Sequence, residues 1–381
     1  MEQEKRKPIA AVICNYNKSH YVTDCIQSVL ESAFTDFDVI VVDNASADDS
    51  VKCIKEKYAG KVTLLENTEN LGGSGGFNTG IRYALQKEYS YVWCLDNDVL
   101  VDENAIGELY AFLESHAEAG MAGSKVYHME APDYVQQFGI EVDWDDTEWG
   151  IRCNLAGYKV ASVGASKVLH CMGAKKESVN TFPTYYAWRN WIQFFIKYTK
   201  EENLEKMCES FLEGMFEIVY DGWYKGEINR SKTVMYAYDD AIHGVTGKAG
   251  ENRIFELDKN QDKLKDLLEG VSTVKIKVQN EELYTEELEA QILEINPQIQ
   301  IWIEGRDDNA NELCRRTFVL CRNIFTIKDF SLKDIFVDIE GRILATEEDV
   351  LKVLNKEYSY QMFLFTQKPL FMEQAKKLRR G

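Results

Sequence analysis

The sequence lacks several features that would narrow its class at once. Its nine cysteines are dispersed and never form a C-x-x-C pair, so the pattern predicts neither a zinc framework nor a disulfide scaffold. Reduced cytosolic thiols are the simplest interpretation. The apolar run that ends at Asn15 is too short for a signal peptide, and no run reaches the roughly 18 residues of a membrane span. We therefore expect a cytoplasmic protein whose membrane contact, if any, is peripheral, at the inner face of the plasma membrane.

Basic residues are scarce relative to acidic ones. The chain has 44 Lys and Arg against 63 Asp and Glu, a net charge of −19. A net anion repels nucleic acid at long range, which argues against a general nucleic-acid binder. A small anionic substrate would need a metal ion or local N–H donors to bind here. The 381 residues, of which 45% are hydrophobic, predict two or three folded domains rather than a disordered chain.

The first hundred residues alternate between strand-like and helix-like segments. Four short runs predict strands: 9–14, 38–42, 62–65 and 91–95. The first two have the composition of strands that are buried in the sheet. Helical patterns lie between them, which predicts a mostly parallel sheet covered by helices. Acidic or glycine-rich residues follow three of the runs. In such sheets the carboxyl edge is where ligands bind, so we expect a site there.

The rest of the chain is less regular up to a glycine-rich link at 244–250, where we expect a domain boundary. The aromatic stretch 185–198 predicts a helix, either buried in a core or meeting a lipid-linked substrate or membrane. Residues 251–381 alternate again and predict a second, smaller α/β domain. We expect YQMFLF at 360–365 to be one of its extended segments, before a final basic helix. The basic end of that helix favours solvent over anionic lipid, because its charges are few.

Asp96-Asn97-Asp98 places two carboxylates two residues apart, directly after an apolar run. Carboxylates at that spacing, where the chain leaves a strand, can reach one divalent cation that also bridges phosphate oxygens. The alternative is a polar turn at the end of a strand, where Asp and Asn are common.

A glycine-rich segment, NLGGSGGFNTG, occupies residues 70–80. We interpret 71–77 as a loop whose backbone N–H groups hold a diphosphate at the start of a helix. It matches neither the P-loop nor the regular dinucleotide fingerprint, and close packing of a helix on the sheet is the alternative.

Asp43, after the second run, can accept hydrogen bonds from a base or ribose. Helix capping is its alternative, although Asp48, Asp49 and Ser50 fit that role better.

An acidic cluster contains Asp145, Asp146 and Glu148. Neighbouring carboxylates repel, which raises one pKa toward that of a useful general base. A solvated acidic loop is the alternative. His170 ends a later strand-like run; it is a structural histidine unless the fold brings it to Asp96 and Asp98.

Taken in order, VICNYN, VVDNASADDS, ENTENLGGSGGFNTG and WCLDND resemble the nucleotide-sugar half of family-2 glycosyltransferases with the GT-A fold. The version N-x-G-G-x-G-G-F is similar to the galactofuranosyl- and rhamnosyltransferase branch. WDDTEWGIRCNLAGYKV followed by KVLH resembles the acceptor-side motif of that branch. The resemblance covers residues 8–250. It implies a Rossmann-like GT-A catalytic domain over 1–250, with a donor half at about 8–100 and an acceptor half at about 101–250, followed by an α/β accessory domain over 251–381.

The resemblance also implies roles for individual residues. Asp43 would contact the nucleobase, and the segment 70–78 would lie near the diphosphate and sugar. Mn²⁺ or Mg²⁺ would be held by Asp96, Asp98 and His170. Asp146 would be the general base, with Asp145 and Glu148 assisting it or binding acceptor. The residues on the nucleotide-sugar side would be Asn15, Asp43, Asn70, Gly72, Gly73, Gly75, Gly76, Asn78 and Asp96.

The implied reaction is an inverting transfer of galactofuranose or rhamnose from a UDP- or dTDP-sugar. The acceptor would be a cell-surface polysaccharide or a lipid-linked glycan, which places the protein in cell-envelope polysaccharide synthesis. One departure matters: residues 99–144 are a shorter segment than this branch usually carries between its metal and base residues.

That short segment motivates an alternative, a nucleotide-sugar-binding relative without transfer that serves a regulatory or scaffold role. A nucleotidyltransferase is disfavoured because it usually needs a basic residue in the glycine-rich segment to bind a triphosphate, and none lies between Leu71 and Thr79. A dinucleotide-dependent oxidoreductase is disfavoured by the irregular spacing of the glycines. For residues 251–381, partner binding, oligomer formation and acceptor handling all stay open.

Overall fold

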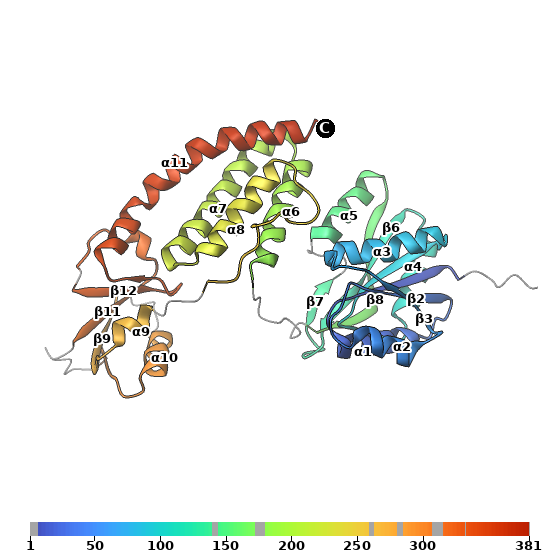
Figure 1. Ribbon diagram of the computed structural model, residues 1–381, viewed down its shortest axis with the longest axis horizontal. Helices are drawn as coiled ribbons and strands as arrows, with labels where there is room; N and C mark the ends of the chain where they lie inside the picture. The colour runs from blue at the N-terminus through green and yellow to red at the C-terminus, as the bar shows by residue number, and fades with distance from the viewer. Residues whose placement is uncertain are drawn as a thin grey trace, which may run out of the picture. The chain divides into compact units, whose positions relative to one another are not determined.

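The computed structural model describes residues 7–138, 144–171, 180–258, 263–279, 285–306, 315–331 and 333–380, without the side chains of residues 137, 138 and 144–146. The chain divides into two compact units, residues 1–177 and 178–381 (Figure 1). Among the described residues, no helix combines the length and the low polarity that crossing a membrane requires.

The first unit is built on a parallel sheet of four strands in the order β3-β2-β1-β4. The strands are β1 (Ile9–Asn15), β2 (Phe37–Asp43), β3 (Val62–Glu66) and β4 (Tyr91–Asp96), and they confirm the four predicted runs. Alternate residues of β1 enter two cores: Ala11 and Ile13 pack toward one side, Ala10 and Val12 toward the other. The helices around this sheet are α1 (Ser19–Leu30), α2 (Ser50–Tyr58), α3 (Gly72–Gln86) and α4 (Ala105–Ser115). Because α1 and α2 cover one face and α3 the other, the continuous apolar runs are explained and the expected α/β class is confirmed (Figure 1).

A second, mixed sheet completes this unit, in the order β5-β8-β6-β7. Its elements are β5 (Val99–Val101), β6 (Ala119–His128), β7 (Val135–Phe138), α5 (Trp144–Leu155) and β8 (Lys159–His170). The acidic cluster at 145–148 therefore lies in a helix, which corrects the alternative of an acidic loop. β8 pairs with β5 on one side and with β6 on the other. The strand that directly follows Asp98, β5, is thereby hydrogen-bonded into the second sheet.

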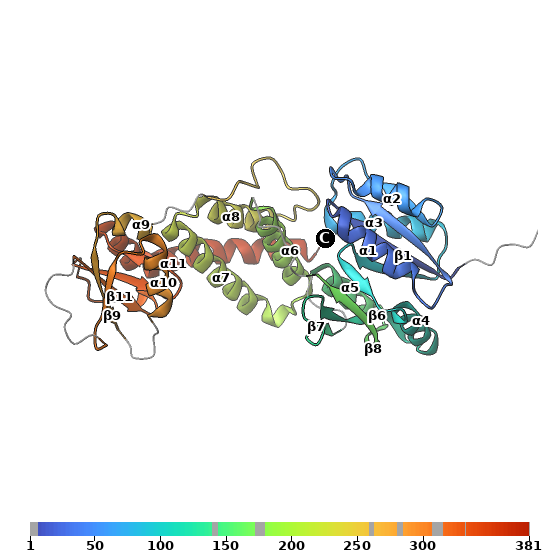
Figure 2. The same cartoon turned by 90° about the horizontal axis from the view of Figure 1, so that it is seen from below.

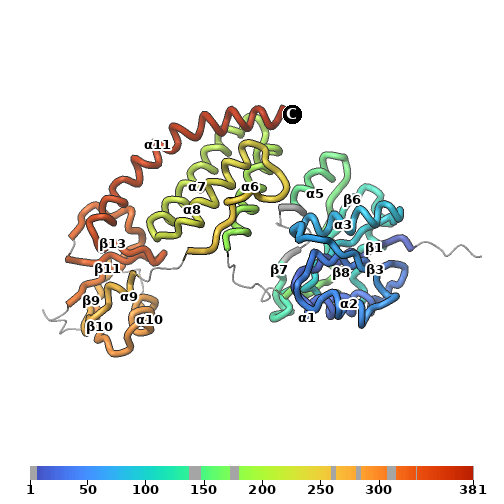
Figure 3. The backbone as a smooth tube through the Cα atoms, viewed as in Figure 1, coloured from blue at the N-terminus to red at the C-terminus, as the bar shows by residue number. Residues whose placement is uncertain are grey.

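The second unit combines a layer of long helices with a small sheet (Figures 2 and 3). The helices are α6 (Phe182–Tyr198), α7 (Leu204–Lys225), α8 (Ile228–Ile242) and α11 (Glu347–Leu378). The remaining elements are α9 (Lys263–Leu268), β9 (Thr273–Val278), α10 (Glu286–Ile295), β10 (Gln300–Ile303), β11 (Arg316–Cys321), β12 (Asp334–Asp338) and β13 (Ile343–Leu344). The sheet order is β10-β9-β11-β12-β13, with only β13 antiparallel.

The division between the units differs from the boundary expected near 244–250. The predicted aromatic helix is confirmed as α6, and it shares one hydrophobic core with α7, α8 and α11. Ile192, Leu212 and Val234 meet Phe371 from the far end of the chain in that core. The glycine-rich link at 244–250 therefore connects parts of one compact unit. Whether the catalytic part ends near residue 250 stays a prediction.

The expectation of an extended segment at 360–365 is wrong, because these residues lie inside the 32-residue helix α11. Aromatic residues favour strands locally, but packing decides the outcome here. Phe363 and Leu364 contact the core of the helical layer, whereas Met362 and Phe365 are exposed. Such apolar composition on both sides of a helix is locally indistinguishable from a buried strand.

The start of α11 is fixed by Asp349, which is 4% exposed. Its carboxylate accepts hydrogen bonds from the backbone N–H groups of Ala345 and Thr346, both at 2.9 Å, and from Lys263 Nζ at 2.6 Å. The Thr346 side chain accepts from the Asp349 N–H in return, which completes a capping box. Burial alone would raise the pKa of Asp349, but the hydrogen bonds from Lys263, Ala345 and Thr346 outweigh it and lower the pKa.

We expect Asp349→Asn to lower the free energy of unfolding by about 1 kcal/mol at pH 7, because a charge-assisted cap is lost. A carboxylate with a lowered folded-state pKa stabilises the fold above its unfolded pKa of about 3.9, and that stabilisation is lost as the pH falls through the folded value. The difference from wild type should therefore shrink below about pH 4. Urea unfolding monitored by circular dichroism measures it. Exposed Glu348→Gln is the control, and a constant difference across pH would exclude the carboxylate's charge as the cause.

Candidate functional site

Polar side chains meet at the carboxyl edge of the parallel sheet, as the sequence predicts. Register places Asn15 beside Asp43 and Cys14 beside Asp96. Asn15 Nδ2 donates to Asp43 Oδ1 at 2.9 Å, and Asn97 Nδ2 donates to Asn15 Oδ1 at 2.7 Å. The ends of three strands are thereby joined by side-chain hydrogen bonds into one polar floor.

Asp43 is part of this floor rather than an open carboxylate. It is only 2% exposed. Its Oδ1 accepts from Asn15 and its Oδ2 accepts from the Ser46 N–H at 2.9 Å. Asp43 therefore orders the turn between β2 and α2, and its contact with a nucleobase stays a prediction.

The glycine-rich segment is helical rather than a loop. α3 begins at Gly72, so the expectation of a loop over 71–77 is wrong in its extent. A Cβ on Gly76 would overlap Cys14 Sγ, and one on Gly80 would overlap Val12 Cγ1. These glycines are required for close packing of α3 on the sheet, which is the alternative the sequence left open. Around Gly73 no atom lies within 4 Å of such a Cβ, so this glycine is not required by packing.

Asn44, which the sequence analysis did not single out, anchors this segment to the strand edge. Its Nδ2 donates to Asn70 Oδ1 and to the Gly72 carbonyl, both at 2.9 Å. Its Oδ1 accepts from Asn67 Nδ2 at 3.0 Å and from the Leu71 N–H at 3.1 Å. The only sequence signal was its place directly after Asp43, where a predicted strand ends. Further along α3, Asn78 Oδ1 accepts from Arg82 Nε at 3.0 Å.

Asp96, Asp98 and His170 come together beside the floor. One ligand atom from each lies within 4.8 Å of the others. The third residue arrives because β8 pairs antiparallel with β5, which sets His170 opposite Val99. The condition under which the sequence made His170 a ligand candidate is therefore met. Two carboxylates and an imidazole form a donor set that suits Mn²⁺, and carboxylate oxygens also suit Mg²⁺.

Asp98 is the most constrained member of this cluster, at 7% exposure. Lys18 Nζ donates to its Oδ2, and His170 Nε2 lies 3.4 Å from its Oδ1. Burial alone would raise the pKa of Asp98, but the hydrogen bonds from His170 and Lys18 lower it. The hydrogen bond to Asp98 raises the pKa of His170 in turn, against the effect of burial. Asp98 is thus held as a carboxylate between the Lys18 ammonium group and the His170 ring.

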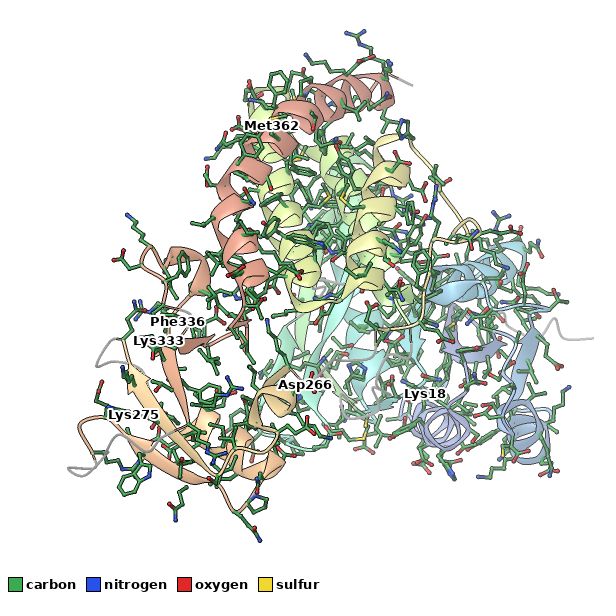
Figure 4. The ribbon with its side chains drawn as sticks, turned by 60° about the vertical axis from the view of Figure 1, so that its left-hand side comes forward. Lys18, Asp266, Lys275, Lys333, Phe336 and Met362 are labelled. Carbon is green, nitrogen blue, oxygen red and sulfur yellow. The ribbon has the colours of Figure 1, made fainter. Side chains whose placement is uncertain are left out.

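Lys18 therefore occupies a position from which it competes with a metal ion for Asp98 (labelled in Figure 4). We expect Lys18→Met to raise the affinity for Mn²⁺, measured without nucleotide, by about tenfold, because one local positive charge disappears. Calorimetric titration of Mn²⁺ into both proteins measures the change. The control is exposed Lys87→Met, directly after the end of α3. Unchanged or weaker Mn²⁺ binding would show that Lys18 does not oppose the ion.

The acidic residues of α5 are only partly described. The side chains of Asp145 and Asp146 lie outside the described part of the structure, so their predicted roles stay predictions. Glu148 Oε2 accepts from Arg152 Nε at 2.6 Å, one helical turn away. α5 packs against β8 and β6 in the same unit as the Asp96, Asp98 and His170 cluster.

Residues 10–161 match the family described as Glycosyl transferase family 2. That segment of the chain is matched as a family-2 glycosyltransferase domain. The match spans the floor residues and the Asp96 and Asp98 pair, and it confirms the resemblance at the level of the family. The galactofuranosyl- and rhamnosyltransferase branch stays a prediction.

Among curated proteins, the chain is similar to the poly-beta-1,6-N-acetyl-D-glucosamine synthase of Staphylococcus epidermidis. The two are 30% identical over 105 residues, which is 27% of this chain and 25% of the relative. The synthase of Staphylococcus aureus strain COL is 31% identical over 98 residues, which is 26% of this chain and 23% of the relative. The chain thus spans about a quarter of the length of these relatives.

Among solved structures, S. aureus TarS 1-349 matches with a TM-score of 0.38 and 14% identity, over 62% of this chain and 88% of that chain. The mannosyltransferase PcManGT from Pyrobaculum calidifontis, solved with GDP-Man and Mn²⁺, matches with a TM-score of 0.35 and 17% identity, over 51% of this chain and 63% of that chain.

Proposed function

We propose that this protein is a metal-dependent, inverting glycosyltransferase that moves a sugar from a nucleoside diphosphate to an acceptor hydroxyl. One observation carries the proposal: the ligand atoms of Asp96, Asp98 and His170 converge at the carboxyl edge of a parallel sheet. Asp96 and Asp98 lie within the residues that match family 2. That edge is where open α/β sheets bind ligands.

The charge of the chain explains why a metal is needed. A protein with a net charge of −19 repels a diphosphate unless local positive charge compensates. Mn²⁺ or Mg²⁺ would offset the negative charge that develops on the leaving diphosphate. Asp96, Asp98 and His170 would hold the ion. Lys18, next to Asp98, would face the same anionic group.

The acceptor side of the proposal depends on α5. Asp146 would take the proton from the acceptor hydroxyl as it attacks, and a single general base suffices for one inverting displacement. Asp145 and Glu148 would assist or bind acceptor. These assignments rest on the motif resemblance of residues 144–160 and on the placement of α5 in the same unit as the metal cluster.

The donor and acceptor are proposed from the motif of the glycine-rich segment. A UDP- or dTDP-linked galactofuranose or rhamnose is the donor we propose, and a cell-surface polysaccharide or lipid-linked glycan is the acceptor. The curated relatives named above make a polymer of N-acetylglucosamine, so UDP-N-acetylglucosamine is the first competing donor to test.

Calorimetric titration with UDP, dTDP and GDP, each in Mn²⁺ and in EDTA, tests the donor site. We expect one nucleotide to bind and to lose its affinity in EDTA. Product formation from the matching sugar nucleotides and a panel of glycan acceptors then tests transfer. Metal-dependent binding without any transfer would favour the non-catalytic, nucleotide-sugar-binding alternative. No binding of any nucleotide would remove both functions.

A further inference from the structure

The helix α11 carries an apolar stripe on its exposed side. The stripe consists of Leu351, Leu354, Tyr358, Met362 and Phe365, and all five side chains are exposed, up to 77% for Phe365. Their spacing of three and four residues keeps them on one side of the helix. Met362 is labelled in Figure 4 at the outer side of the helical layer.

The opposite side of α11 is already in use. Val353, Phe371 and Ala375 are buried, and Phe363 and Leu364 pack against the core shared with α6–α8. A helix that is apolar all round is normally covered all round, whereas a surface helix has one polar face. The stripe therefore indicates a surface that is covered in the working protein.

Several apolar residues of α11 correspond in pairs about a midpoint between Gln361 and Met362. Leu351 lies as far to one side of it as Met372, which is half-buried against the core of the helical layer, lies to the other. Leu354 corresponds in the same way to Pro369, and Tyr358 to Phe365. Two copies of this helix packed antiparallel about a two-fold axis would therefore place apolar side chains at matching heights along about 32 Å.

Two residues of opposite charge correspond about the same midpoint, one on each side of the apolar residues. Glu347 precedes the stripe and Lys376 follows it; both are exposed and lie equally far from the midpoint. Neither forms an ion pair within the described part of the chain, although Lys376 is near enough to Glu205 to help lower the pKa of that carboxylate. In an antiparallel pair, Glu347 of each copy would meet Lys376 of the other, at both ends of the contact. A parallel pair would instead set like charges together.

We propose that α11 forms an antiparallel, two-fold homodimer of this protein through the stripe. A membrane surface is the other occupant that an apolar stripe suggests, but interfacial helices carry Lys and Arg along their polar borders. Here the uncharged Asn355, Gln361 and Thr366 border the stripe, and Glu357 lies exposed beside it. The lysines of this part of α11, Lys352, Lys356 and Lys368, are each paired with a glutamate of this chain. The net charge of −19 also opposes approach to anionic lipid.

Sedimentation of the full-length chain over about a hundredfold dilution series tests this proposal. We expect a dimer for the wild type. Phe365→Glu should raise the dimer dissociation constant at least about a hundredfold, because a central apolar contact becomes a buried charge. Leu85→Glu, at a similarly exposed leucine on α3, should leave it unchanged. A wild-type monomer at every concentration, or an intact dimer in Phe365→Glu, would overturn the proposal.

The orientation has its own test, which does not depend on loss of folding. Glu347→Lys and Lys376→Glu should each weaken the dimer about fivefold to tenfold, and the combined variant should restore it. Failure of the combined variant to recover would reject the antiparallel contact.

Flotation with phosphatidylglycerol vesicles tests whether the stripe binds a membrane instead. A monomeric wild type that floats with the vesicles, and no longer does so in Phe365→Glu, would assign the stripe to lipid and overturn the dimer.

Discussion

Replacing Asp98 by asparagine is expected to lower kcat/KM for sugar transfer by about a thousandfold in Mn²⁺. Asparagine keeps the shape of the side chain but removes the charge that makes it a strong ligand. The carboxylate is buried and already faces the cationic Lys18 and the imidazole of His170. Its loss should therefore leave excess positive charge at the cluster and one weak ligand where the ion needs a strong one.

The same variant separates metal binding from general disturbance of the fold. Calorimetry should show that nucleotide binding no longer responds to Mn²⁺, while circular dichroism stays as in the wild type. Glu103→Gln removes an exposed charge five residues away, just before α4, and should have no effect. If Asp98→Asn bound Mn²⁺ and nucleotide as the wild type does, Asp98 would not be a ligand.

Asp146→Asn provides the contrasting result on the acceptor side. We expect it to keep metal-dependent nucleotide binding and to lose transfer by about a hundredfold or more, because a positioned base typically contributes that much. The measurements are the same titration and product assay. Full transfer in this variant would move the base elsewhere on α5 or beyond it.

The parallel sheet was predictable because its chemistry is local. The central strands β1 and β2 are buried on both faces, so runs such as 9–14 are apolar without interruption, and these two strands end in the polar residues Asn15 and Asp43. The edge position of Asn15, Asp43 and Asp96 follows directly, since parallel strands end on one side. The sequence alone therefore predicted that these three residues share one edge, but not the hydrogen bonds that join Asn15 to Asp43 and Asn97.

The third member of the metal cluster was predicted through the motif resemblance and not from local chemistry, because it depends on a long-range pairing. Nothing near His170 in the sequence indicates that β8 turns antiparallel to β5 and reaches Asp98. Lys18 is similar, since its neighbours carry no sign of a carboxylate that lies 80 residues further on. The prediction for residues 360–365 was wrong for another reason. Both sides of α11 are apolar there, so the sequence shows no helical period of apolar and polar residues.

Close packing of α3 on the sheet leads to the second large expected effect. A Cβ on Gly80 would overlap Val12 Cγ1 on β1 and come within 3.1 Å of Val42 Cγ2 on β2. Both valines are fully buried, so neither can move into open space. We expect Gly80→Ala to lower the free energy of unfolding of the first unit by about 2–3 kcal/mol, despite the helix propensity that alanine adds.

Gly73→Ala is the matched control, because it lies in the same helix with no atom within 4 Å of the added Cβ. It should leave stability unchanged or raise it by about 0.5–1 kcal/mol. Combining Gly80→Ala with Val12→Ala removes the overlapping methyl group, so the double variant should lose less than the two single losses together. Denaturant unfolding of the wild type, the two single variants Gly80→Ala and Val12→Ala, and the double variant, monitored by tryptophan fluorescence, measures the coupling between positions 12 and 80. Strict additivity would show that contact with Val12 is not what makes glycine necessary at position 80, and the helix would then be held off the sheet by Val42 alone.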